Sequence, residues 1–231
     1  MLFTVLSIDN ILSIWEAMLL ERKIFFLSKS KTILNRICLA LTTLIYPFKW
    51  NHVYIPILPL KCIGCADAFV PLIMGICFNI KLDELPEDAF VVDIDANKIV
   101  KNNEEIPKLN EKLNKKFDKY KYKYNNPVDV LKIQYIDEVF NYCDTTVGKE
   151  KFNTLEIRNI FFEFFINLLA NFEKYVKINK VISQDNNNDN DIEPVTFNRK
   201  QFLKDNNSSN VNLIFFLFHF FYFIKFIFFF F

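Results

Sequence analysis

Two cysteines, Cys62 and Cys65, could take part in chemistry because only two residues separate them. A C-x-x-C pair can hold zinc or act as a redox couple. A structural zinc ion needs four ligands, and the sequence has no second C-x-x-C and no H-x-x-H. A thioredoxin-type pair would follow a strand and open a helix, with a Gly-Pro type of pair between the cysteines. The pattern therefore favours two thiols without such a role on a buried helix or turn, and predicts neither metal nor cofactor.

The second candidate is His52, which lies in an apolar, aromatic stretch. A hydrolytic triad would need a serine or cysteine nucleophile and an acidic partner at a recognisable spacing, and neither is found. The sequence predicts a structural histidine with satisfied hydrogen bonds.

A third candidate is the pair Asp93 and Asp95, which flank Ile94 at the end of a predicted strand. Two carboxylates at this spacing could bind a cation. They could equally form turn hydrogen bonds with Asn97 and nearby backbone, because aspartate side chains commonly stabilise turns in this way. The turn is the favoured interpretation.

Composition limits the function classes further. A chain of 231 residues fits one domain or one lobe of a larger one. The 28 basic and 27 acidic residues nearly cancel, so a basic field for nucleic acid is not expected. Only 3 glycines are present, and no phosphate-loop or dinucleotide-binding glycine motif occurs. The odd number of cysteines and the absence of a signal-like N-terminus predict a cytoplasmic protein.

The elements that must position these residues lie in residues 1–100. An apolar stripe after a cap at Asp9 predicts a helix, and a second helix fits Lys31–Leu44, ended by Pro47. Pro56 favours an edge position or a bulge for its strand. Alternating helices and buried strands predict an α/β fold with a mostly parallel, helix-flanked sheet. Four apolar runs are the expected strands: 23–28, 52–58, 70–76 and 89–94.

Beyond the first hundred residues the composition of the chain changes. Residues 101–126 form a charged linker, and 101–123 hold eight lysines and four acidic residues. This stretch is either a solvated linker, which is favoured, or a patch for anionic lipid or an acidic partner. Residues 127–205 predict a helical subdomain with helices at 130–142 and 154–178, the second capped by Thr154, and a disordered loop at 183–193.

Residues 206–231 form a phenylalanine-rich tail. The segment 211–231 has the length of a bilayer span, although Lys225 would cost about 2.5–3.5 kcal/mol at the bilayer centre. Three interpretations stay open: a membrane anchor, a core helix, or translation past the true end of the coding region.

Four segments carry a family resemblance. They are IDNILSIWEAMLLERKIFFLS (8–28), LIYPFKWNHVYIPILP (44–59), VPLIMGI (70–76) and LPEDAFVVDIDANKI (85–99). In this order they strongly resemble the central part of DENN domains. Residues 154–178 and 197–204 are more weakly similar to the distal DENN region.

The chain departs from the family pattern at three places. Ala68-Phe69-Val70-Pro71 stands where the family usually has Ala-Pro-x-Pro, so one turn-fixing proline is lost. The family's upstream longin-like lobe is missing before residue 8, and the phenylalanine-rich tail stands where the family has a more polar final helix.

The resemblance implies a function without covalent catalysis. DENN domains bind Rab-type small GTPases between an upstream lobe and the lobe represented here, and favour GDP release by preferring the nucleotide-free GTPase. The alternatives are a GTPase-binding scaffold without exchange activity and a tail-anchored structural membrane protein. The candidate partner-binding residues are Arg22, Lys49, Trp50 and His52. The motif residues expected to preserve packing and turns are Trp15, Glu21, Pro47, Trp50, Pro56, Pro59, Pro71, Gly75, Asp93 and Asp95.

Overall fold

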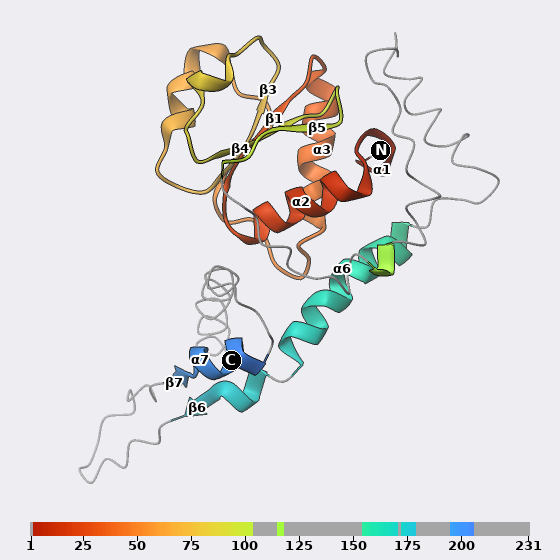
Figure 1. Ribbon diagram of the computed structural model, residues 1–231, viewed down its shortest axis with the longest axis vertical. Coiled ribbons are helices and arrows are strands. Elements are labelled where there is room, and N and C mark those ends of the chain that lie inside the picture. The colour runs from red at the N-terminus through yellow and green to blue at the C-terminus, as the bar shows by residue number, and fades with distance from the viewer. Residues whose placement is uncertain (1, 104–114, 118–153, 171, 179–194, 206–231) are drawn as a thin grey trace, which may run out of the picture.

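A five-stranded sheet forms the centre of the N-terminal region in the computed structural model, which describes residues 2–103, 115–117, 154–170, 172–178 and 195–205 (Figure 1). Its strand order is β2-β3-β1-β4-β5. The first four strands run parallel, and β5 pairs antiparallel with β4. The strands are β1 (Lys23–Leu27), β2 (Val53–Ile55), β3 (Leu72–Ile76), β4 (Ala89–Asp93) and β5 (Lys98–Lys101).

The predicted mostly parallel sheet is confirmed, with all four expected strands present. Strands β1, β3 and β4 are continuous apolar runs because both of their faces are covered. Strand β2 lies at the edge of the sheet, which agrees with the edge position predicted from Pro56. The sequence did not predict β5, a four-residue strand with a lysine at each end and two apolar residues between them.

Three helices, α1 (Leu2–Val5), α2 (Ile8–Leu19) and α3 (Lys31–Thr43), share one hydrophobic core with one face of the sheet. The expected cap at Asp9 is wrong: Ser7 is the N-cap, and its hydroxyl accepts a hydrogen bond from the backbone N–H of Asn10 at 3.4 Å. Asp9 lies in the first turn instead. Serine caps well because its short side chain can fold back to a free N–H of the first turn.

The other face of the sheet is covered by a shorter layer. It comprises the 3₁₀ helices η1 (Leu60–Asp67) and η2 (Leu82–Glu84) with the segments that flank them. Leu58, Ala66 and Leu85 from this layer pack with Phe25, Met74 and Val91 of the sheet. Figure 1 shows the η1 segment and α2 on opposite sides of the strands.

A long helix, α6 (Thr154–Leu169), lies against α2 and leads to the C-terminal elements (Figure 1). The expected helix over 154–178 is too long: the chain turns into η4 (Phe172–Tyr175) and then β6 (Val176–Ile178). Strand β6 pairs antiparallel with β7 (Val195–Phe197), which is followed by α7 (Arg199–Asp205). Thr154 was predicted to be the N-cap that precedes this helix. It is instead the first residue of the helix.

Several expectations lie outside the described residues: the helix at 130–142, the loop at 183–193, the tail at 206–231 and most of the lysine-rich stretch. Within the part of the chain that the structure describes, no helix has the length and apolar character needed to cross a bilayer.

Candidate partner-binding edge

The residues that precede β1, β2, β3 and β4 meet at one edge of the sheet, because parallel strands begin on the same side. Strand β5 runs the other way and therefore ends at this edge. We define the amino edge by Arg22, His52, Pro71, Asp88 and Lys101, the residues at these strand ends. Two of the four candidate partner-binding residues, Arg22 and His52, are thus at this edge.

His52 is joined to the turn that precedes β1. Its Nε2 lies 2.9 Å from Oε1 of Glu21, and the two side chains are only 17% and 14% exposed. Glu21 has a φ of 52°, in the left-handed region, and so turns the chain sharply between α2 and β1. Since β3 lies between β1 and β2, the pair ties together segments on both sides of β3. His52 therefore makes a hydrogen bond of the kind predicted for a structural histidine.

Trp50 and Lys49 lie in the segment before β2. The Trp50 indole N–H donates to the carbonyl of Val53 at 3.1 Å, and its ring packs edge-on to His52 at 5.2 Å between centroids. Trp50 also packs against the main core, whereas Lys49 is exposed. Trp50 and His52 are therefore held in place and half-buried, and Lys49 is the candidate most open to a partner.

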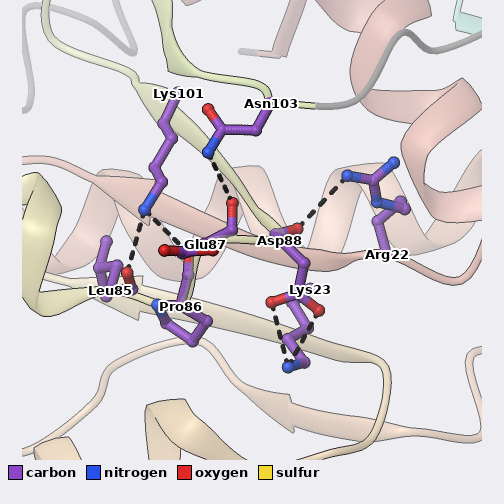
Figure 2. Close-up of polar contacts among 8 residues, drawn as sticks. All are labelled: Arg22, Lys23, Leu85, Pro86, Glu87, Asp88, Lys101 and Asn103. Carbon is purple, nitrogen blue, oxygen red and sulfur yellow. Dashed lines mark hydrogen bonds and ion pairs between the residues drawn. The ribbon is translucent and has the colours of Figure 1, made fainter.

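Arg22 and Lys23 meet Asp88 from the start of β4 (Figure 2). The Arg22 guanidinium donates to the carbonyl of Asp88 at 3.3 Å, and Lys23 Nζ lies 3.0 Å from one carboxylate oxygen and 3.2 Å from the other. Lys23 Nζ also lies 5.8 Å from the centre of the Phe69 ring, and Phe69 is fully exposed. This part of the amino edge therefore brings together a cation, a carboxylate and an exposed aromatic ring.

Sequence reasoning missed Lys23, Asp88 and Phe69. A usable signal was present, because Lys23 and Asp88 each stand at the start of a strand that was predicted to be parallel. Such positions share one edge of the sheet, as noted above. Phe69 stands in the segment that departs from the family pattern, where an apolar residue replaces a turn-fixing proline.

The pair Asp93 and Asp95 lies at the opposite edge of the sheet. The Asp93 carboxylate accepts a hydrogen bond from the backbone N–H of Ala96 at 3.0 Å. The Asp95 carboxylate accepts from the Ser28 hydroxyl at 2.6 Å and from the backbone N–H of Lys29 at 2.8 Å. The turn interpretation is confirmed for Asp93, whereas the Asp95 carboxylate binds the segment that follows β1, 66 residues away in the chain. No group of three or more metal-ligating side chains occurs among the described residues.

The C-x-x-C pair lies on η1, where Cys62 and Cys65 are both exposed free thiols. The expectation of a buried helix or turn is therefore wrong, because η1 covers the sheet through Ala66 and turns its cysteines outward. Cys38, in contrast, is buried in the main core, and this burial raises the pKa of its thiol to about 12.

The remaining motif residues lie in turns and packed positions. The Trp15 indole N–H donates to the carbonyl of Leu44 at 3.2 Å inside the core. The Tyr46–Pro47 peptide bond is cis. Pro59 is the residue before η1, and Pro71 the residue before β3. Pro56 and Gly75 approach each other through their backbones.

Comparisons with known proteins bear on the same segment. The family model of the DENN (AEX-3) domain matches residues 1–97. The chain is 30% identical over 185 residues to the DENN domain and WD repeat-containing protein SCD1 of Arabidopsis thaliana, an alignment covering 78% of this chain and 15% of that protein. It is 40% identical over 99 residues to elicitor of plant defense protein 1 of Fusarium odoratissimum, an alignment that covers 42% of this chain and 11% of that protein. DENN domain-containing protein 2A of Mus musculus is 35% identical over 107 residues, an alignment that covers 45% of this chain and 11% of that protein. The chain thus spans between 11% and 15% of the length of these relatives.

Proposed function

Residues 1–97 of this chain belong to the DENN domain family, and from this premise we propose that the protein promotes nucleotide exchange on a Rab-type small GTPase in membrane trafficking. The observation that carries the proposal is the family match. It covers β1 to β4, the four parallel strands that build the amino edge. We place the activity in the cytoplasm, where it requires no cofactor of the protein's own.

Exchange of this kind is a coupling between two ligands of the GTPase. A protein that binds the nucleotide-free GTPase more tightly than the GDP-bound form must weaken GDP binding by the same factor. Only a binding surface is required, without acid, base or nucleophile. The amino edge and the segment before β2 support such a role, because together they combine the exposed Phe69 and Lys49 with side chains that hydrogen bonds hold in place.

We propose that the GTPase contacts this edge at Arg22 and His52, and contacts the segment before β2 at Lys49 and Trp50. The half-buried Trp50 and His52 would present a fixed surface, since each has a hydrogen-bond partner and each packs against the other. Lys49 is exposed and would act at the rim. Charges at the rim of an interface mainly change the association rate and its salt dependence.

The test is the release of labelled GDP from a panel of Rab GTPases, catalysed by the complete gene product. We expect faster release from at least one Rab. The charge reversal Lys49→Glu should lower kcat/KM on that Rab about 3–10-fold, an effect that shrinks at high salt.

The matched control is Lys98→Glu. Lys98 is also an exposed lysine, but it opens β5 and pairs in register with Asp93, so it lies at the opposite edge of the sheet. Its reversal should leave exchange unchanged. If the wild-type protein neither accelerates release from any Rab nor binds one, the proposal fails. Stable binding to a GTP-loaded Rab without faster release would identify a scaffold instead.

A further inference from the structure

The segment before β4 has an unusual set of hydrogen bonds to its backbone. Each of the four successive carbonyls from Leu85 to Asp88 accepts a bond from a distant side chain (Figure 2). Lys101 Nζ donates to Leu85 at 3.0 Å and to Pro86 at 2.9 Å, and also to Leu82 at 3.1 Å. The Asn103 amide donates to Glu87 at 2.9 Å, and the Arg22 guanidinium to Asp88 at 3.3 Å.

Lysine suits this arrangement because of its geometry. An ammonium group carries three N–H donors on one atom, and here three carbonyls converge on that atom. A guanidinium spreads its donors over a planar fork and could not satisfy the same three acceptors. Lys101 reaches them because β5 pairs with β4 in a register that places Lys101 beside Val91, near the start of β4.

The donors Lys101 and Asn103 lie beyond residue 97, where the family match ends. They nevertheless fix the backbone that carries Asp88, which lies between Arg22 and Lys23 in Figure 2. The Asp88 side chain is 49% exposed, although that of Lys23 is only 14% exposed, and an ion pair open to solvent on one side holds its partners only weakly in one geometry. The position of Asp88 therefore depends on the fixed backbone of the segment 82–88.

We propose that Lys101 and Asn103 are positioning residues for the amino edge. They hold segment 82–88 in place, so that the Asp88 carbonyl keeps Arg22 in the geometry that the GTPase meets. This inference rests on the proposed exchange function, and neither positioning residue needs to touch the partner. It extends the functional unit past the matched residues 1–97 to the end of β5.

The first test does not depend on any GTPase. Hydrogen exchange, followed by mass spectrometry on the complete gene product, compares Lys101→Met with Lys98→Met on the same strand. Lys101→Met keeps a long apolar side chain but removes all three donors. The backbone N–H groups of Glu84, Leu85 and Ala89 donate to the carbonyls of Lys81, Leu82 and Pro86, in or next to this segment, so they should exchange about tenfold faster. Lys98→Met should leave them unchanged, and equal protection in both variants would overturn the proposal.

The second test asks whether Lys101 acts through Arg22. In the GDP-release assay, Lys101→Met should lower kcat/KM about 3–10-fold when Arg22 is present, and less than about 2-fold when Arg22 is already alanine. A general loss of stability would lower both backgrounds equally, and that additive result would overturn the proposal.

The two failures can be told apart. If the wild-type protein accelerates GDP release from no Rab, the proposed exchange function is wrong, and so is the proposal that Lys101 positions Arg22 for a GTPase. Hydrogen exchange would still decide whether Lys101 holds segment 82–88.

Discussion

At Gly75 the backbone of the segment after β2 closely approaches the sheet. A Cβ at this position would lie 2.0 Å from the carbonyl oxygen of Pro56 and 2.9 Å from its carbonyl carbon. Both are backbone atoms, so a side-chain rotation could not relieve the contact. The approach also allows the backbone N–H of Leu58 to donate to the carbonyl of Gly75 at 2.7 Å. Glycine is therefore required here by space.

We predict that Gly75→Ala lowers the free energy of unfolding by about 2–4 kcal/mol, because the strand and the Pro56 segment must separate. Urea denaturation followed by far-UV circular dichroism would measure it. Gly64→Ala is the matched control, since outside its chain neighbours and its own helix no atom lies within 4 Å of a Cβ there. Equal denaturation midpoints for the two variants would contradict the argument.

At the scale of elements, the packing of α6 on α2 depends on aromatic rings. Trp15 of α2 meets Phe161, Phe164 and Phe165 of α6 edge-on, at centroid distances of 5.2, 4.9 and 5.8 Å. Edge-to-face contacts of this kind add stability beyond the buried area. Phe165 also packs against Phe48 at 4.9 Å, so it joins α6 to the segment after α3 as well.

We predict that Phe165→Ala destabilises the protein by about 3–5 kcal/mol, because it leaves a cavity between three elements. Leu155 is on the same helix but 67% exposed, so Leu155→Ala should change stability by no more than about 0.5 kcal/mol. Chemical denaturation of both variants provides the measurement. A similar loss in both would mean that α6 does not pack as described.

At the scale of the whole molecule, the core of the matched domain extends beyond the matched residues. Trp15 is completely buried, and part of its cover is α6, whose first residue is Thr154. Phe117 adds to this cover through Phe161, at 5.1 Å between ring centroids. Residues 1–97 therefore leave an apolar surface on α2 that later parts of the chain must bury.

A chain that ends after Asn103 tests this dependence. It retains β1 to β5 but lacks α6, so we expect exposed apolar surface around Trp15 and increased binding of the dye ANS. Its denaturation midpoint should fall by at least as much as that of Phe165→Ala. Unchanged dye binding together with an unchanged midpoint would show that the N-terminal region is complete without α6.

Local sequence was sufficient for most of the sheet and its helices. Continuous apolar runs identified β1, β3 and β4, because strands covered on both faces carry few polar residues. The 3.6-residue stripe identified α2 and α3, and the proline after Ile55 indicated the edge strand. The turn at Asp93 was also predictable, since its carboxylate binds the backbone three residues later in the chain.

Tertiary structure decided whatever depends on residues far apart in the chain. Strand β5 forms because the free edge of β4 is beside it, and β6 forms because β7 returns to pair with it. The amino edge arises in the same way: Glu21 meets His52 across 31 residues, and Arg22 meets Asp88 across 66. Residue types and spacing can place these residues at one edge of a parallel sheet, but which of them meet follows from the order of the strands in the folded sheet.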